Sequence, residues 1–407
     1  MALSCVQWLL VLGMLVTGSI NTLSKKAQND SKVKGVPVPG PNGTEVAEEH
    51  DFDHPWFQTV IMFIGETCCL IGLFIQRKRE RDQFRRQIMQ DFNQEPIEAL
   101  QQGRVFQFIF AVPTICDLFG TTLAGIGLLW VNASVWQMLR GSIIIFTGIL
   151  SKIFLKRKLR GIHWTGMVVT MLGLVLVGIS SVFNEEDNDK KDVKKSILGI
   201  VLILAGQVVS SSQMIIEELF LKKRKFPPLQ VVGMEGSFGV FFMVALVLPV
   251  LYFIPGDQPG GRYENSIDAL YQIYNSPGLL VFCLLYLSSI AFYNYFGLAV
   301  TKSLTAVHRT LIDACRTIMV WLVSLFIHYV VSEDFGEPWD NTYGILQVDG
   351  FFFLMIGTAL YNELISFPWI PCLRPQPPED TDPTPEAASI QATQDSDERT
   401  PLLSGDT

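Results

Sequence analysis

Two arginines stand inside apolar stretches of this chain, where a charged side chain is costly. Arg140 lies in the stretch from Ser134 to Ser151, and Arg316 lies in an apolar stretch at 307–331. An arginine at membrane depth costs about 2.5 kcal/mol or more, so it usually faces a bundle interior or a wet cavity. We therefore expect both arginines to bind or gate an anionic group. The alternative for Arg140 is a position near a helix end, from which its long side chain reaches the lipid headgroups.

Further polar residues stand in other apolar stretches and are candidates to complete such a site. In a bilayer these groups must pair with one another or line water. The candidates for substrate contact, beside the two arginines, are Gln137, Asn21 and Asn294. The acids that could carry a proton or pair with the arginines are Glu66, Glu235, Asp117 and Asp313. Burial disfavours the charged form of a carboxyl group, so a buried acid is suited to proton transfer.

The sequence lacks the motifs of several common enzyme classes. It has no phosphate-cradling glycine loop with a lysine, no His-Glu-x-x-His and no nucleophile elbow. Its seven cysteines show neither a disulfide framework nor a zinc spacing. We therefore predict a protein that is not an enzyme and that requires no metal, no cofactor and no nucleic acid.

The elements that must position these residues are membrane helices. The chain is 49% hydrophobic and 17% charged, whereas soluble domains carry about 25% charged residues. At about 20 residues per crossing, ten apolar segments are long enough to span a bilayer. They lie near 4–24, 56–76, 105–128, 133–154, 160–183, 196–218, 229–254, 277–300, 307–331 and 342–365. The first segment lacks the basic start of a signal peptide, so we expect a retained helix.

The charges of the connecting loops predict an orientation. Lysine and arginine collect after the second, fourth and sixth segments, whereas the loops after the fifth and ninth segments are acidic. Basic loops face the cytosol, so both termini are predicted to be cytosolic. The first loop, 25–55, is then lumenal, and it carries the glycosylation sequon Asn42-Gly43-Thr44. We therefore predict that Asn42 is glycosylated.

The first five segments can be laid on the last five as an internal repeat. Arg140 aligns with Arg316, Glu66 with Glu235, and Asp117-Leu-Phe-Gly120 with Asn294-Tyr-Phe-Gly297. Because five is an odd number, the second copy enters the membrane from the opposite side, as in alternating-access transporters. The repeat also predicts that Arg140 and Arg316 face one central cavity. The predicted domains are a first repeat at 1–183, an acidic lumenal linker at 184–195, a second repeat at 196–366 and a cytosolic tail at 367–407.

The tail at 367–407 is predicted to be disordered and to carry a sorting signal. It is rich in Pro, Thr, Asp and Glu, a composition typical of disordered segments. Near its end, Glu398, Leu402 and Leu403 have the spacing of an acidic dileucine motif. Cytosolic adaptor proteins read such motifs and deliver membrane proteins to endosomes and lysosomes. The alternative is an apolar pair that no adaptor reads.

Three stretches of the chain resemble a known family. Met14–Ser24, Trp136–Gly148 and Ile356–Asn362 are similar to the drug/metabolite transporter superfamily and, within it, to solute carrier family 35, subfamily F. The resemblance implies ten helices in two inverted repeats and a lysosomal membrane protein. It further implies the mitochondrion or other endomembranes as alternative locations, with a mitochondrial membrane protein as a partner.

These patterns together predict a fold class and a function. The fold is an all-α integral membrane protein with ten transmembrane helices in two inverted five-helix repeats. The function is secondary-active or facilitative transport of a small polar or anionic metabolite across the lysosomal membrane. The alternative is a scaffold or adaptor that keeps the transporter fold but binds other membrane proteins.

Overall fold

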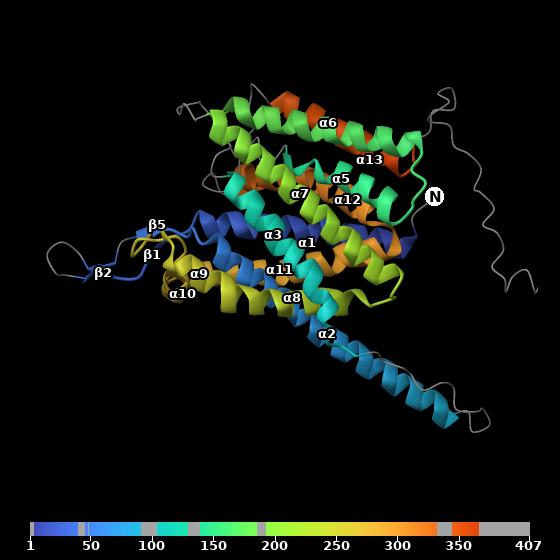
Figure 1. The fold of residues 1–407 in the computed structure, drawn as a ribbon, viewed down its shortest axis with the longest axis horizontal. Helices are drawn as coiled ribbons and strands as arrows, with labels where there is room; N and C mark the ends of the chain where they lie inside the picture. Colours follow the sequence, from blue (N-terminus) through green and yellow to red (C-terminus); the bar gives the residue numbers. More distant parts are fainter. Residues whose placement is uncertain are drawn as a thin grey trace, which may run out of the picture.

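The computed structural model describes residues 4–39, 45–47, 49–90, 104–128, 139–184, 193–331 and 344–365. Within these residues the chain is mostly helical, and the long helices lie together in one bundle (Figure 1). Eight of the described helices are long and apolar enough to cross a membrane, and two further apolar helices are shorter. The expected helical membrane protein is therefore confirmed, whereas ten crossings stay a prediction.

The first half of the chain contributes five helices to the bundle. They are α1 (Cys5–Asn29), α2 (Pro55–Gln90), α3 (Ala111–Leu128), α5 (Ile143–Phe154) and α6 (Gly161–Asn184). A 3-10 turn, η1 (Phe108–Phe110), precedes α3. The two shorter apolar helices, Ile143–Phe154 and Gly161–Leu176, both belong to this half.

The second half contributes the remaining long helices. They are α7 (Val193–Lys222), α8 (Pro228–Phe242), α9 (Leu248–Phe253), α11 (Pro277–Ser303), α12 (Ala306–Phe326) and α13 (Gly344–Tyr361). A π-helical turn, η2 (Met243–Val247), joins α8 to α9, and a second, η3 (Ile327–Val331), extends α12. Each of the ten apolar segments expected from the sequence thus contains a helix.

Local sequence signals explain where several helices begin. Ser4 and Gln7 form a capping box at α1: the Gln7 backbone N–H donates to Ser4 Oγ at 3.3 Å, and the Ser4 N–H donates to Gln7 Oε1 at 2.9 Å. Ser276 caps α11 in the same way, accepting from the Leu279 N–H at 3.3 Å. Pro277 follows at the first helical position, where its missing N–H has no helical partner to lose.

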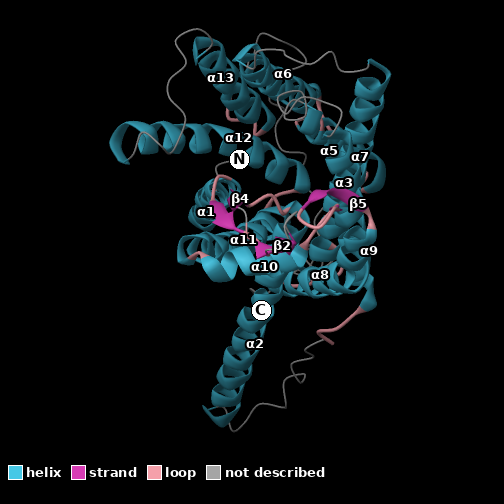
Figure 2. Cartoon of the chain, turned by 90° about the vertical axis from the view of Figure 1, so that its left-hand side faces the viewer, coloured by secondary structure: helices cyan, strands magenta, loops and turns pink. Residues whose placement is uncertain are grey.

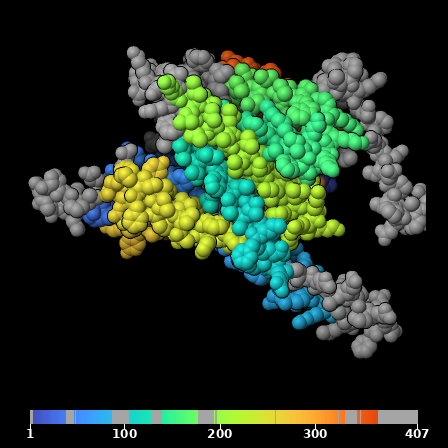
Figure 3. All heavy atoms as spheres, in the orientation of Figure 1, coloured from blue at the N-terminus to red at the C-terminus, as the bar shows by residue number. Residues whose placement is uncertain are grey.

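Helices from the two halves pack on each other in pairs. The pairs are α1 with α11, α2 with α8, α3 with α7, α5 with α12, and α6 with α13. Figure 3 shows α3 and α7 side by side on the near face. A Cβ atom on Gly166 of α6 would lie 2.8 Å from the Gly357 carbonyl oxygen of α13. A Cβ atom on Gly206 of α7 would lie equally close to the Gly120 carbonyl oxygen of α3. These glycines therefore let the paired backbones touch.

Two connections fold together at one end of the bundle, and we call this region the end cap (Figures 1 and 2). Its strands are β1 (Lys32–Lys34), β2 (Val38–Pro39), β3 (Glu45–Val46), β4 (Glu49–Asp51) and β5 (Pro255–Gln258), and its helix is α10 (Ser266–Asn275). β1 pairs antiparallel with β4, with Val33 opposite His50, and β2 pairs antiparallel with β3. Because α10 packs on β1, the first loop is attached to the connection between α9 and α11.

Helix α2 extends beyond the other helices (Figures 1 and 2). It has 36 residues, which is about 54 Å of helix at 1.5 Å per residue, against about 30 Å of bilayer hydrocarbon. Its exposed last turns include Arg85 and Arg86.

We call the end of the bundle that holds Arg157 and Lys222 the basic end.

Several predicted features lie outside the described residues. They are Gln137, Asn42, the acidic linker residues 185–192, and the tail with Glu398, Leu402 and Leu403. The predicted domain boundaries stay predictions as well; the helices that flank the linker end at Asn184 and begin at Val193.

Candidate functional site

Polar side chains inside the bundle form two clusters along α12. Arg309 and Arg316 are seven residues apart, so they lie on nearly the same face, about 10 Å from each other along the helix. The acidic cluster consists of Glu66, Asp117, Glu217, Glu235, Asn294 and Arg309. The arginine cluster consists of Thr22, Lys25, Arg140, Tyr293, Asp313 and Arg316.

In the arginine cluster, Arg316 is held by fixed partners from three helices. Its Nε lies 2.9 Å from Asp313 Oδ1, one turn earlier on α12. Its Nη1 donates to Thr22 Oγ1 at 2.9 Å and to the Gly18 carbonyl at 3.3 Å, both on α1. The Tyr293 hydroxyl of α11 donates to the same Asp313 oxygen at 2.5 Å, and the Arg316 guanidinium lies 5.2 Å from the centre of the Tyr293 ring. These contacts fix the direction of the Arg316 side chain.

Arg140 belongs to the same cluster. It is within electrostatic reach of Arg316, Asp313 and Tyr293, and the residue is exposed. Lys25 of α1 is a further cation within reach of Arg140. Like charges in one place repel each other, and an anion between them would offset that repulsion. The structure therefore brings together the two arginines that the sequence singled out, and it adds Lys25, which the sequence analysis assigned to a loop.

Asn21 lies on α1 next to the residues that hold Arg316. Its side-chain oxygen is buried and has no hydrogen-bond partner among the described residues. Buried polar atoms normally have a partner in the protein or in water. A ligand or a water molecule could therefore use this oxygen, and the predicted role of Asn21 in substrate contact stays a prediction.

The acidic cluster gathers three of the four predicted acids around Arg309. Glu66 accepts a hydrogen bond from the Asn294 amide, so Asn294 belongs to this cluster. Glu235 and Asp117 lie within electrostatic reach of each other and of Arg309. The fourth predicted acid, Asp313, is not here, because it pairs with Arg316.

Sequence reasoning missed two members of the acidic cluster, Glu217 and Arg309. Arg309 Nη1 lies 2.5 Å from Glu217 Oε2, and the two residues are 8% and 2% exposed. The sequence analysis did not include Arg309 among the candidate site residues. A signal was present, because Arg309 and Arg316 share one helical face. Gly297 leaves the space that Arg309 needs, since a Cβ atom there would lie 2.9 Å from Arg309 Nε.

A third group of charges ties three segments together at the basic end. Glu218 of α7 pairs with Arg157, which follows α5, and with Lys222 at 2.9 Å. Its second oxygen accepts from the Ala306 N–H at 3.0 Å, at the start of α12. Lys222 also donates to the Leu304 carbonyl in the turn between α11 and α12. Glu218 is fully buried, so this network closes the basic end between α5, α7 and α12.

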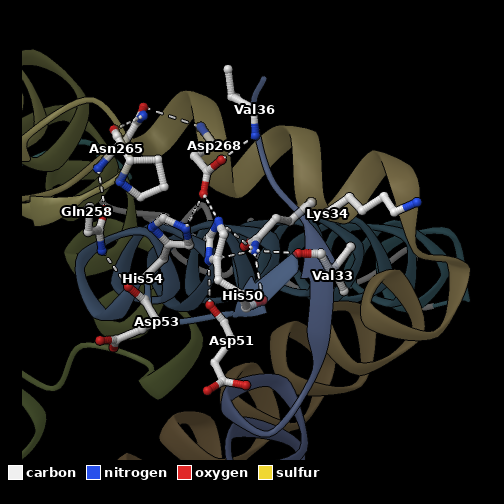
Figure 4. Close-up of polar contacts among 12 residues, drawn as sticks. Val33, Lys34, Val36, His50, Asp51, Asp53, His54, Gln258, Asn265 and Asp268 are labelled. Atoms are coloured by element: carbon white, nitrogen blue, oxygen red, sulfur yellow. Dashed lines mark hydrogen bonds and ion pairs between the residues drawn. The ribbon is translucent and has the colours of Figure 1, made fainter. Parts of the chain in front are cut away.

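A fourth group lies in the end cap, outside the membrane segments (Figure 4). His54 Nδ1 lies 3.0 Å from Glu264 Oε1, and its Nε2 lies 3.2 Å from Asp268 Oδ2. Burial would lower the pKa of His54, but hydrogen bonds to Asp268 and Glu264 outweigh burial and raise the pKa to about 9. Asp268 also accepts from the Val36 N–H at 2.6 Å. His54 therefore attaches the first loop to α10 as a charged group at neutral pH.

The described residues contain no group of three or more His, Cys, Asp or Glu side chains placed to hold a metal ion. In the end cap both ring nitrogens of His54 already bond to carboxylates. The chemistry that these clusters offer is the binding of charged groups.

Comparisons with known proteins agree with this arrangement. A sequence profile of the nucleotide-sugar transporter family matches residues 46–249. Solute carrier family 35 member F6 of Rattus norvegicus is 37% identical over 364 residues, which are 88% of this chain and 89% of that protein. The protein of the same name from Homo sapiens is 38% identical over 355 residues, 86% of this chain and 87% of its own length. The resemblance expected from the sequence is confirmed.

One solved crystal structure shows the same fold. Its TM-score is 0.53 and it is 14% identical, covering 88% of this chain and 96% of its own. At this identity the likeness supports the fold alone. The relatives named above are carriers rather than enzymes, which confirms the prediction that this protein is not an enzyme.

Proposed function

Because this chain belongs to solute carrier family 35, within the nucleotide-sugar transporter family, we propose that it carries a small anionic or polar metabolite across the lysosomal membrane. The proposed mechanism is facilitative or secondary-active alternating access between two inverted repeats, with both termini in the cytosol. The mitochondrion or another endomembrane is the alternative location.

One observation supports an anionic substrate: Arg140 and Arg316 come from different halves of the chain and lie within electrostatic reach of each other. A guanidinium stays charged at any physiological pH and presents a planar fork that suits carboxylate and phosphate groups. Arg316 is already aimed by Asp313 and Thr22, whereas Arg140 is exposed. A substrate anion between them would contact one fixed and one accessible cation, with Asn21 as a neighbouring amide.

The helix pairing supports the inverted repeat. If α1, α2, α3, α5 and α6 correspond in order to α7, α8, α11, α12 and α13, then the pair α1–α11 corresponds to α7–α3. The pairs α2–α8, α5–α12 and α6–α13 each correspond to themselves. These five pairs are thus unchanged as a set when the halves are exchanged, as a two-fold axis in the membrane plane requires.

The two ends of the bundle support alternating access. At the basic end, Glu218 holds three segments together through Arg157, Lys222 and the start of α12. Arg140, by contrast, is accessible. This combination fits a state that is closed toward the basic end. Opening that end would require the Glu218 network to separate.

Coupling and delivery complete the proposal. Secondary-active transport needs a coupling ion, for which Glu66, Glu235, Asp117 and Asp313 are the proposed carriers or counter-charges. We propose the dileucine tail as the adaptor-binding signal that delivers the protein to lysosomes, and Asn42 as a lumenal glycan site. The partners are then adaptor proteins, the lipid bilayer and, by resemblance, a mitochondrial membrane protein.

Two connected experiments test the proposed function. Metabolites are first compared between lysosomes isolated from cells with and without this protein. Anions that accumulate or fall in its absence are then tested for counterflow in liposomes that contain the purified protein. We expect at least one anion to exchange faster than in empty liposomes. If no metabolite differs and no anion exchanges, the scaffold alternative is supported, and cross-linked membrane-protein partners would then be the expected finding.

A further inference from the structure

The acidic cluster contains more negative groups than its cation can balance. Four carboxylates come from four helices: Glu66 from α2, Asp117 from α3, Glu217 from α7 and Glu235 from α8. Arg309 is the cation among them, and it lies against Glu217. An unbalanced charge inside a bilayer costs several kcal/mol unless it is neutralised or solvated. At least one further positive charge is therefore needed in this cluster.

Glu235 is the acid in this cluster that is placed to take up the additional positive charge. The residue is 8% exposed, and its Oε1 is buried without a hydrogen-bond partner among the described residues. The α2 and α8 backbones meet closely here, because a Cβ atom on Gly236 would lie 2.6 Å from Glu66 Cβ. Glu66 already accepts from the Asn294 amide, whereas no donor serves this oxygen of Glu235. A carboxyl group that carries a proton becomes a donor itself and loses its repulsion toward Glu66.

We propose that the acidic cluster is a proton site centred on Glu235 and shared with Glu66, with the Glu217–Arg309 pair as its fixed counter-charge. The identity of the coupling ion rests on the function proposed above; the proton site itself does not. A proton fits better than a metal ion, because the described residues hold no group of ligands placed for a metal.

The position of the cluster between the two halves gives the proton a way to move. Glu66 and Asp117 belong to the first half, whereas Glu217, Glu235 and Arg309 belong to the second. When the halves rock against each other, the spacing between Glu66 and Glu235 must change, and so must the repulsion that holds the proton. The proton can then be taken up in one state and released in the other.

The remaining polar groups at the site do not replace the proton. Among the described residues, the titratable groups within electrostatic reach of the acids include Cys69 of α2, Cys116 of α3 and Tyr286 of α11. The neutral Gln213 amide of α7 donates to Glu217 Oε1 at 3.0 Å. Thiols and phenols bring no positive charge. Asp313 was predicted as a possible carrier, but it accepts from Tyr293 and pairs with Arg316, so we place it outside the proton site.

Infrared difference spectroscopy of the full-length protein in lipid tests this proposal with the proton as the only ligand. A protonated carboxyl group has a C=O stretch that a carboxylate lacks. We expect a carboxyl band in the difference spectrum between pH 5 and pH 8, lost in Glu235→Gln and kept in Asp349→Asn, which removes an exposed acid from α13. A band of unchanged intensity in folded Glu235→Gln would overturn the proposal. A band removed by Na⁺ at constant pH would assign the site to sodium instead.

Carbodiimide labelling of the wild-type protein gives an answer even if the variant does not fold. The reagent modifies protonated carboxyl groups in apolar surroundings. We expect mass spectrometry to find Glu235 or Glu66 labelled several-fold more at pH 5 than at pH 8. Glu218 is the internal control, because it is equally buried but paired with Arg157 and Lys222. Labelling of Glu218 to the same extent would contradict the proposal. Neither measurement uses the transported solute. The proton site can therefore fail its tests while the counterflow assay succeeds, and it can pass them while counterflow fails.

Discussion

Arg309 and Arg316 lie on one face of one helix, yet their surroundings carry opposite charge. Around Arg309 the neighbouring helices supply Glu66, Asp117, Glu217 and Glu235. Around Arg316, the carboxylate comes from its own helix, as Asp313, and the neighbouring charge is the cation Arg140, which has Lys25 within its own reach. The surroundings of an arginine in a membrane helix therefore depend on the segments packed against it as well as on its own helix.

The difference between the two clusters separates two tasks. Arg309 meets an excess of fixed acids, so its charge is needed whether or not a solute is present. Arg316 is also held by fixed groups, but it lies beside the exposed Arg140, so this cluster has positive charge to offer to a mobile anion. One cluster is suited to hold a proton, and the other to hold an anion.

Removal of Arg309 should have the largest effect on folding. Arg309→Ala would leave Glu217 and the three other acids of the cluster without their cation, and breaking a buried pair costs about 3–5 kcal/mol. We expect a strongly lowered melting temperature in detergent and little folded protein. Arg316→Ala is the matched variant, for which we expect a smaller loss of stability. If both variants melt alike, the comparison between the two clusters fails.

The charged group in the end cap, centred on His54, should give the next largest effect. His54→Ala removes the hydrogen bonds to the buried Glu264 and Asp268, which should destabilise the protein by roughly 1–3 kcal/mol. Glu49→Ala, which removes half of an exposed pair with Lys34 at 4.0 Å, is the control and should cost less than about 1 kcal/mol.

The pH dependence of the cap has a defined sign. The pKa of His54 is raised to about 9 in the folded protein, against about 6.5 when unfolded. Its contribution to stability is thus complete below pH 6.5 and is lost as the pH rises through about 9. Melting curves from pH 5 to pH 10 should show this loss in wild type and not in His54→Ala. A wild-type loss below pH 6 with none near pH 9 would refute the assignment.

The sequence predicted the parts of this structure that depend on hydropathy and on periodic spacing. The ten apolar segments each contain a helix, and Arg140 and Arg316 lie within electrostatic reach of each other; the inverted repeat from which they were aligned stays a prediction. Glu217 was missed because two consecutive acids at 217 and 218 look like the polar end of a span. The packing of α7 against α12 shows their different partners: Glu217 pairs with Arg309, whereas Glu218 pairs with Arg157 and Lys222. His54 was missed because its partners are more than 200 residues away.

The proposed sorting signal would determine in which organelle the protein resides. We expect Leu402→Ala with Leu403→Ala to move the protein from lysosomes to the cell surface, because an adaptor needs both apolar side chains together with Glu398. Imaging with a lysosomal marker checks this, and Ser404→Ala is the control. If the double variant still overlaps fully with lysosomes, another signal directs the protein.

The glycan site gives the smallest effect and fixes the orientation of the two clusters. Asn42→Gln should migrate slightly faster on a gel, as should wild type after glycosidase treatment, with Asn29→Gln as the control. A C-terminal tag should be accessible to protease in intact organelles. The cap would then be lumenal, and Arg309 would lie nearer the cytosol than Arg316. A protected tag would exclude this ten-crossing orientation.

The central claim is that an anion binds between Arg140 and Arg316, and counterflow in liposomes tests it most directly. Hydrogen bonds to charged groups contribute about 1.5–3 kcal/mol each. We therefore expect Arg140→Ala and Arg316→Ala to exchange the metabolite anion roughly ten to a hundred times more slowly than wild type. Arg140→Lys should retain part of the activity, since it keeps the charge but loses the planar fork. Arg86→Ala, on the exposed end of α2, should exchange normally. Wild-type exchange by folded Arg140→Ala and Arg316→Ala would contradict the account.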